Sequence, residues 1–237
     1  MSTIAAHLDD VLSRIDRATA DAGRPAGSVR LLAVSKTFGV DAVREALAAG
    51  QRAFGENYVQ ESLDKIAALS GDRVDGAPLE WHFIGPLQSN KTRPVAEHFD
   101  WVHSVDRLKI AERLSAQRPT DLPPLQVCLQ VNISGEASKS GVTPADVPAV
   151  ARAMAALPNL QLRGLMAVPE PESDPARQRA PFKALRELFD ALRADGLALD
   201  TLSMGMSGDL EAAIAEGATM VRIGTAIFGA RDYGARA

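Results

Sequence analysis

Apolar and polar residues follow one another along the chain in two patterns. Residues 3–22 carry apolar side chains at helical spacing, which predicts an amphipathic helix: Ile4, Leu8, Val11, Leu12, Ile15 and Ala18. Residues 29–36 (VRLLAVSK) are a mostly apolar run, typical of a strand buried on both faces in a parallel sheet. Residues 41–50 return to the helical pattern, with Asp41 at the start and Gly50 past the end.

The two patterns then repeat along the chain. Further strands are predicted at 52–57, 80–87, 101–105, 125–133, 160–169, 199–207 and 219–229. Further helices are predicted at 58–69, 89–98, 106–117, from Thr143 and Pro144 onward, 175–195 and 208–216. Eight strands separated by helices indicate a parallel sheet, and at this length they favour a closed (β/α)8 TIM-type barrel with an extra N-terminal helix. We expect a single domain over residues 1–237, with an open doubly wound sheet as the alternative topology.

Composition and charge exclude several classes of protein. Hydrophobic residues make up 46% and charged residues 24% of the 237, as in ordinary globular proteins. The net charge of −4 and the lack of a basic stripe argue against a nucleic-acid binder. The sequence has neither a secretory leader pattern nor an apolar run long enough to cross a membrane, so we expect no membrane contact and a cytoplasmic location. The single cysteine, Cys128, cannot form an intramolecular disulfide and is expected to be a small buried hydrophobe.

Polar residues or glycines follow nearly every predicted strand at its C-terminal end. The residues at these ends are Ser35 to Thr37, Gly55 to Asn57, Gly85 with Gln88 and Asn90, His103–Ser104, Asn132, Met166 to Pro169, Ser207–Gly208 and Gly224–Thr225. The active sites of such barrels lie at this end of the strands, so the pattern predicts a site for a small polar ligand. His82, His98 and His103 lack the spacing of metal ligands, so we assign no metal site and expect His82 to pack within its strand.

Lys36 directly follows an apolar run, at the mouth of the predicted barrel. A lysine there could simply extend to solvent from the strand end. Alternatively, desolvation would lower the pKa of its amine and free it to attack an aldehyde. The aldehyde could belong to a cofactor or to an aldolase substrate, and Lys36 alone does not decide between them.

Two segments near the end of the sequence suggest a phosphate site. Ser207 and Gly208 lie where a strand turns into a helix, although Asp209 would also serve as a plain helix cap. Gly224 and Thr225 follow the last strand, and the last two strand–helix loops form the recurrent phosphate site of this barrel. Arg222 should face the same side as Gly224, and either a buried carboxylate or a ligand acceptor such as a pyridine nitrogen would satisfy it.

These segments together resemble a known family. The motifs AVSKT, FGENYVQE, WHFIGPLQSNK, HSVDR, QVNISGEASKSGV, RGLMAVP, LSMGMSGDLEAAIAEG and VRIGTAIFG occur in order between about residues 29 and 231. They are similar to those of the pyridoxal phosphate homeostasis proteins, single-domain relatives of the N-terminal barrel of alanine racemase.

The resemblance implies pyridoxal 5′-phosphate as the cofactor, held as a Schiff base on Lys36. It implies that Ser207, Gly224 and Thr225 hold the phosphate, and that Arg222 faces the pyridine nitrogen. An arginine there suits a site that does not stabilise a protonated pyridinium. Asn57 and Met166 would line the ring pocket.

The resemblance also implies how this chain differs from the racemase. Racemisation needs a second base, a tyrosine from a further domain of the partner subunit, and Tyr58 and Tyr233 of this chain stand in no equivalent context. We therefore expect no catalytic residues and a monomeric, non-catalytic carrier or buffer in vitamin B6 and amino-acid homeostasis. Its partners would be the cofactor and, transiently, apoenzymes that depend on it. The alternatives are a one-domain amino-acid racemase and an aldolase without cofactor.

Overall fold

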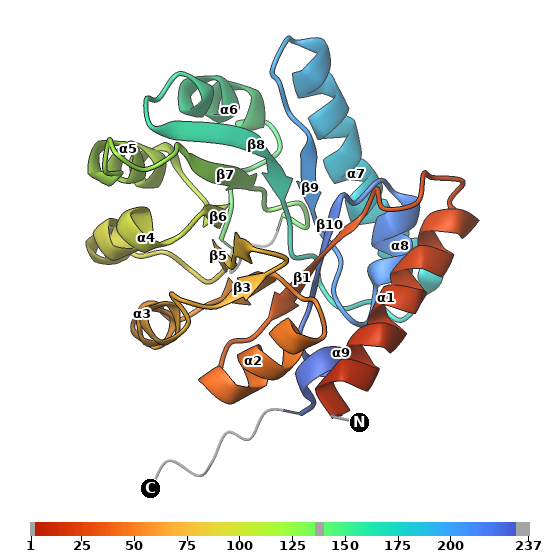
Figure 1. Ribbon diagram of the computed structural model, residues 1–237. Helices are drawn as coiled ribbons and strands as arrows, with labels where there is room; N and C mark the ends of the chain where they lie inside the picture. The colour runs from red at the N-terminus through yellow and green to blue at the C-terminus, as the bar shows by residue number, and fades with distance from the viewer. Residues whose placement is uncertain (1–2, 136–139, 231–237) are drawn as a thin grey trace, which may run out of the picture.

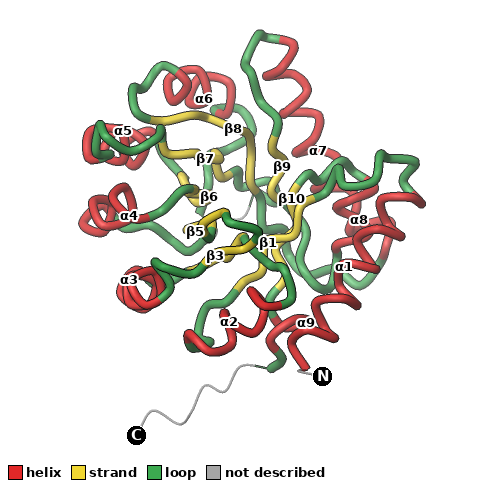
Figure 2. Tube along the Cα trace, viewed as in Figure 1, coloured by secondary structure: helices red, strands yellow, loops and turns green. Residues whose placement is uncertain are grey.

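A closed parallel barrel forms the centre of the molecule. The computed structural model describes residues 3–135 and 140–230, and within them eight strands pair in the order β1-β10-β9-β8-β7-β6-β5-β2. Helices surround the strands, as Figure 1 and Figure 2 show. The predicted barrel with a leading helix is confirmed, and the open sheet is wrong because β1 pairs with both β10 and β2.

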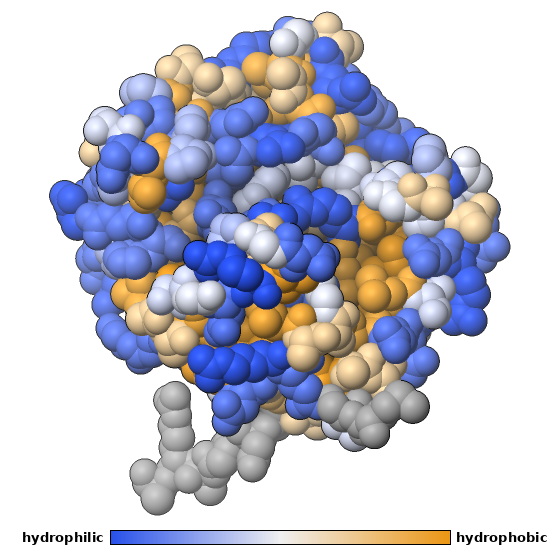
Figure 3. Space-filling model, viewed as in Figure 1, coloured by the Kyte–Doolittle hydropathy of each residue, from blue (hydrophilic) through white to orange (hydrophobic). Residues whose placement is uncertain are grey.

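The barrel strands are short and almost wholly buried. They are β1 (Arg30–Val34), β2 (Ala53–Glu56), β5 (Glu80–Phe83), β6 (Trp101–Val105), β7 (Leu125–Gln130), β8 (Leu160–Met166), β9 (Thr201–Ser203) and β10 (Met220–Ile223). The helices are α1 (Thr3–Asp21), α2 (Val40–Ala48), α3 (Val59–Ala68), η1 (Ser89–Lys91), α4 (Thr92–His98), α5 (Leu108–Gln117), α6 (Val147–Ala155), α7 (Pro175–Ala194), α8 (Leu210–Ala215) and α9 (Thr225–Phe228). In Figure 3 hydrophilic residues cover much of the face shown, with hydrophobic ones visible between them.

Several strands end earlier than predicted, and the helix predicted to open at Thr143 and Pro144 begins at Val147. Two further differences concern the type of element that forms. The last strand ends at Ile223, and the residues predicted to continue it form the short helix α9 instead. The apolar run continues there because Phe228 stacks on Phe38 at 5.1 Å between ring centroids, so α9 packs on the loop after β1. A small hairpin, β3 (Arg73–Val74) with β4 (Ala77–Pro78), also precedes β5, where no strand was predicted.

The leading helix α1 packs against α8 and α9, near the C-terminal end of the described chain. Its buried face holds Ile4, Leu8, Val11, Ile15 and Ala18. Outside this apolar face, the Nδ1 atom of His7 lies 3.1 Å from the carbonyl oxygen of Ile227 in α9. Arg14 pairs with Glu211 of α8 at 2.8 Å and donates to the carbonyl oxygen of Ser207. Helix α1 therefore supports the loops after β9 and β10 from outside.

The barrel interior combines apolar and polar side chains. One cluster contains Leu32, Ala53 and Met220, and another Trp101, Cys128 and Met166. Cys128 is fully buried, as expected, and burial raises the pKa of its thiol to about 12. Among the helices described, none is both long and apolar enough to cross a bilayer.

Candidate functional site

A cavity of about 380 Å³ opens at the C-terminal ends of the strands. Its lining comes from six strand ends or the loops after them: Val34, Lys36, Asn57, Ile84, Val168, Met206, Ser207, Gly208, Arg222, Gly224 and Thr225. We call it the lysine cavity. Six of the seven residues predicted to bind a cofactor line it, although they lie far apart in the sequence. Its volume lies within the range of small-molecule and cofactor sites.

The end of β1, which carries Lys36, is held in place from behind. Lys65 of α3 donates to the carbonyl oxygen of Ser35 and to Glu56 Oε1, both at 2.8 Å. The hydroxyl of Ser35 also donates to Glu56 Oε1, at 2.6 Å. These three residues are buried, so the bonds are shielded from water. Lys36 itself is half-buried at the cavity wall.

The turn after Lys36 is strained and clamped. Thr37 adopts φ 70°, in the left-handed region that residues with a Cβ seldom occupy. Its N–H donates to Glu61 Oε1 at 2.7 Å, and Glu61 also pairs with Lys65. Burial raises the pKa of Glu56, while the neighbouring Lys65 and Ser35 oppose that shift. The network fixes the backbone on both sides of Lys36.

Asn57 directly follows β2 and lines the cavity, and its side-chain oxygen lacks a hydrogen-bond donor among the described residues. Its Oδ1 is buried and has no partner within the described part of the chain. Gly85 lets the neighbouring loop approach closely, because a Cβ on it would lie 2.3 Å from the carbonyl oxygen of Asn57. A buried polar atom without a partner is costly, so this amide suits a ligand with a polar edge.

The loops after β9 and β10 supply small donors on the same cavity wall. Ser207 and Gly208 lie in a turn closed by Asp209, whose Oδ1 accepts from the N–H of Met206 at 2.6 Å. Asp209 thus closes the turn and makes no side-chain cap bond to α8. Gly224 and Thr225 begin α9, and the first N–H groups of a helix have no partner within it. Hydroxyl and N–H donors of this kind suit an anion such as phosphate.

Arg222 reaches the lysine cavity from inside the barrel. It is 5% exposed, and its guanidinium donates to the carbonyl oxygens of Ser203 and Ala167 at 2.6 and 2.9 Å. Within residues 3–135 and 140–230, no carboxylate lies at ion-pair distance from it, so the buried ion pair considered from the sequence is not formed there. Burial lowers the pKa of Arg222 to about 10, and the more distant Asp209 partly opposes that shift.

Met166 lies elsewhere than the other six predicted residues. It lines a neighbouring cavity of about 240 Å³, together with Ser104, Asp106 and Gln130. Ile84 and Val168 line both cavities, so the two spaces adjoin. Met166 therefore borders the site from its far side.

Sequence reasoning missed two sets of residues around the site. The first is the Lys65–Glu56 pair behind Lys36, since a lysine on an amphipathic helix is ordinarily a surface residue. The second is His82, His103 and Ser203, which lie beneath Arg222 in the barrel. His82 is buried in its strand as expected, and it also forms hydrogen bonds with His103 and Glu80. The sequence did hold a signal for this contact. Side chains alternate along the strand EWHFIG, so Glu80 and His82 lie on the same face.

The comparisons with known proteins agree with this geometry. The family described as alanine racemase, N-terminal domain, matches residues 7–232, which places the chain in the class of alanine-racemase-type barrels. A pyridoxal phosphate homeostasis protein of Pseudomonas aeruginosa is 66% identical over 237 residues, the full length of both chains. The chain belongs to the pyridoxal phosphate homeostasis protein family, and the resemblance inferred from the motifs is confirmed.

Solved structures show the same relationship. PipY of Synechococcus elongatus, solved with PLP bound, is 41% identical, with a TM-score of 0.82 over 95% of this chain and 100% of its own. Alanine racemase of Corynebacterium glutamicum is 19% identical, with a TM-score of 0.69 over 95% of this chain and 63% of its own. The likeness to the racemase concerns the fold alone.

Proposed function

We propose that this chain binds pyridoxal 5′-phosphate reversibly, as a Schiff base on Lys36, and acts as a non-catalytic carrier or buffer in vitamin B6 and amino-acid homeostasis. The observation that carries the proposal is the lysine cavity, which brings together an amine, a buried guanidinium and a group of small anion donors. The names of the relatives and the PLP-bound structure of PipY support it. The whole chain would act as one domain, as a monomer in the cytoplasm.

Each part of the cofactor has a suitable group in the site. The cofactor supplies an aldehyde, and the amine of Lys36 would bind it covalently and reversibly. Ser207, Gly224 and Thr225 would hold the phosphate through hydroxyl and N–H donors. Arg222 would donate to the pyridine nitrogen, which accepts only when it carries no proton.

Two further residues would border the ring. Asn57 Oδ1 has no partner among the described residues, which supports a role for this amide in binding a ligand. Met166 would make apolar contact from the neighbouring cavity.

The absence of enzymatic activity is part of the proposal. Racemisation needs a base on each face of the cofactor. Of the two tyrosines, Tyr58 is 52% exposed and outside the lining of both cavities, and Tyr233 lies outside the described residues. The relatives are named for homeostasis of the cofactor, which also supports a binding role.

The visible absorption spectrum before and after borohydride reduction tests the attachment. The purified protein should absorb in the visible range, and reduction should bleach that band and fix the cofactor on the peptide that contains Lys36. Lys36→Ala should carry no reducible cofactor. The exposed Lys183, changed to alanine, is the matched control and should label normally. A label on another lysine, or none, would refute the assignment.

Two measurements separate the carrier from the one-domain racemase. The loaded protein, incubated with L-alanine and other amino acids in deuterated water, should cause no α-deuterium exchange with turnover. It should instead restore activity to an apoenzyme that depends on pyridoxal phosphate, mixed with it at equal concentration. Rapid exchange with turnover would establish the racemase, and a colourless protein that reacts with a keto sugar phosphate would establish an aldolase.

A further inference from the structure

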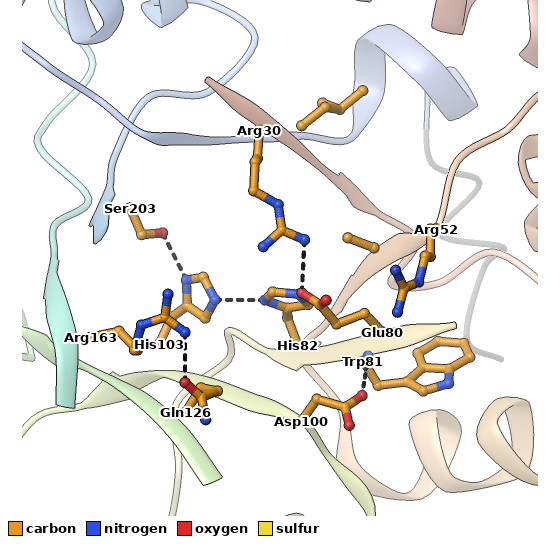
Figure 4. Close-up of polar contacts among 12 residues, drawn as sticks. Arg30, Arg52, Glu80, Trp81, His82, Asp100, His103, Gln126, Arg163 and Ser203 are labelled. Carbon is orange, nitrogen blue, oxygen red and sulfur yellow. Dashed lines mark hydrogen bonds and ion pairs between the residues drawn. The ribbon is translucent and has the colours of Figure 1, made fainter. Parts of the chain in front are cut away.

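A chain of hydrogen-bonded side chains crosses the barrel interior beneath Arg222. The guanidinium of Arg222 donates to Ser203 Oγ at 2.7 Å, and Ser203 Oγ lies 2.7 Å from His103 Nδ1. His103 Nε2 lies 2.8 Å from His82 Nδ1, and His82 Nε2 lies 2.7 Å from Glu80 Oε1. Figure 4 shows the part from Ser203 to Glu80. Ser203, His103 and His82 are wholly buried, so no water competes for these bonds.

The far end of this chain is a carboxylate. Glu80 opens β5, at the opposite end of the strand from the lysine cavity, and its side chain is 18% exposed. Although burial alone would raise the pKa of Glu80, its bonds from His82 and Arg30 lower it to about 2. Arg30 donates to Glu80 Oε1 at 3.0 Å. Glu80 is therefore ionised at neutral pH and can only accept hydrogen bonds.

The charge at Glu80 sets the direction of every bond above it. Because Glu80 accepts, His82 Nε2 must donate, and Nδ1 of a neutral His82 must then accept from His103 Nε2. His103 Nδ1 accepts in turn from the hydroxyl of Ser203, whose oxygen accepts from Arg222. Both histidines are thus protonated on Nε2, and every donor in the chain points away from Arg222.

The surroundings of the two histidines favour their neutral forms. Burial lowers the pKa of His82, against the opposing charges of Glu80 and Asp100, and Arg30 adds to the lowering. Burial lowers the pKa of His103 further, and positive charge on His82, Arg222 or Arg30 would act in the same sense. The ring of Trp101 also stacks on His82, at 5.3 Å and 11° between planes.

We propose that Ser203, His103 and His82 are positioning residues that link Arg222 to the carboxylate of Glu80 through a one-directional hydrogen-bond relay. Arg222 needs such a link because, among the described residues, its other hydrogen bonds go to neutral carbonyl oxygens. Hydrogen bonds in a chain polarise one another, so a distant carboxylate can stabilise the guanidinium and fix its orientation. The inference rests on the proposed function, in which Arg222 faces the pyridine nitrogen. A ligand acceptor at Arg222 would then alter the bonds at His103 and His82.

The first test needs no cofactor. Long-range ¹⁵N–¹H NMR distinguishes the two neutral tautomers of histidine from its cation, and the sequence has four histidines to assign. His82 and His103 should both appear as neutral rings protonated on Nε2 from about pH 6 to about pH 8. Protonation on Nδ1, or a cationic ring in that range, would overturn the relay.

The second test asks whether a change travels along the relay. Glu80→Gln keeps the size of the side chain but removes its charge. It should shift the ¹⁵N frequencies of both rings, including that of His103, which does not touch residue 80. Ser115→Ala is the control, because Ser115 is a buried serine of α5 that bonds to Pro158 outside the relay. An unchanged His103 in Glu80→Gln would refute the coupling.

The third test adds pyridoxal 5′-phosphate. In the wild type and in Ser115→Ala, binding should shift the ring nitrogens of His103. In Ser203→Ala most of that shift should disappear, and the pH profile of the cofactor's absorption should change. An equal His103 response in Ser203→Ala would contradict the proposal, and if that variant does not fold, Ser203→Cys, whose thiol is a weak hydrogen-bonding group, gives the same comparison. If the wild type binds no cofactor, the proposed function fails while the tautomer test still stands.

Discussion

The ammonium group of Lys65 lies 2.8 Å from the carbonyl oxygen of Ser35, the residue directly before Lys36. Lys65 thus fixes the position of the backbone that carries Lys36. Lys65 is 3% exposed, and Glu56, its partner at 2.8 Å, is fully buried. A buried pair of this kind is costly to form, but it fixes one backbone geometry where a flexible strand end would leave several.

Removing Lys65 should destabilise the fold strongly. Lys65→Met keeps the apolar stem but leaves the Glu56 carboxylate buried without its counter-charge, which ordinarily costs about 3–5 kcal/mol. The free energy of unfolding, measured in urea, would show the loss. The control Lys183→Met removes an exposed lysine and should change stability by no more than about 0.5 kcal/mol. The double variant Lys65→Met with Glu56→Gln should recover part of the loss, because it also removes the buried charge. Equal stability of Lys65→Met and Lys183→Met would show that the Lys65–Glu56 pair does not stabilise the fold.

The phosphate assignment predicts a selective loss of affinity. Ser207→Ala and Thr225→Ala should each weaken binding of pyridoxal 5′-phosphate about ten-fold or more, since a hydrogen bond to a charged group contributes about 1.5–3 kcal/mol. Pyridoxal without its phosphate should bind all variants alike. Thr143→Ala, which removes a hydroxyl bonded to Asp146 outside the cavity, is the matched control. Equal losses with both ligands would place the effect elsewhere than at the phosphate.

The buried histidines predict how stability depends on pH. Because burial lowers the pKa of His82 and His103 in the folded state, the unfolded chain binds more protons below its histidine pKa of about 6.5. The two neutral histidines therefore contribute fully to the free energy of unfolding above that pH. As the pH falls below it, each histidine lowers the free energy of unfolding by about 1.4 kcal/mol per pH unit.

A histidine variant isolates this effect from the carboxylates. Between about pH 6.5 and pH 5 the free energy of unfolding should fall less steeply in His82→Gln than in the wild type. The difference should be roughly half of the loss that both histidines cause together. Replacing the exposed His98 by glutamine is the control for the substitution itself. Denaturant titrations at four pH values suffice, and parallel curves for His82→Gln and the wild type would mean that His82 is protonated in the folded state.

Gly85 should be intolerant of a side chain for steric reasons. A Cβ there would lie 2.3 Å from the carbonyl oxygen of Asn57, so Gly85→Ala must displace the loop that carries Asn57. Such overpacking costs about 1–3 kcal/mol, and cofactor affinity should fall with it. Gly71→Ala meets no atom within 4 Å and should be neutral. Wild-type stability and affinity in Gly85→Ala would show that the two loops move independently.

The barrel and much of the candidate site could be predicted from the sequence because both follow from short-range patterns. Buried parallel strands are apolar runs, and Lys36, Asn57, Ser207 and Gly224 each lie where such a run stops. Closure of the barrel then brings all strand ends together, whatever their separation in the sequence. The seven assigned roles stay predictions, and Met166 lines the neighbouring cavity rather than that of Lys36.

Contacts between distant residues could not be predicted in the same way. His82 and His103 are 21 residues apart, and His103 and Ser203 are 100 apart. Their meeting depends on strand register and side-chain direction inside the closed barrel, neither of which one sequence specifies. The end of β10 was misplaced because Phe228 is apolar for packing against Phe38, which a search for strands cannot distinguish from a buried strand.

The directional bonding of Ser203, His103, His82 and Glu80 has a consequence for evolution. Each neutral member donates one hydrogen bond and accepts one along this line, so replacing one by a residue that cannot make both bonds leaves a neighbour without its partner. Such a replacement becomes tolerable only after a second one has changed the neighbour. These four positions should therefore show strong epistasis, and lineages that alter one of them should have altered the others as a block.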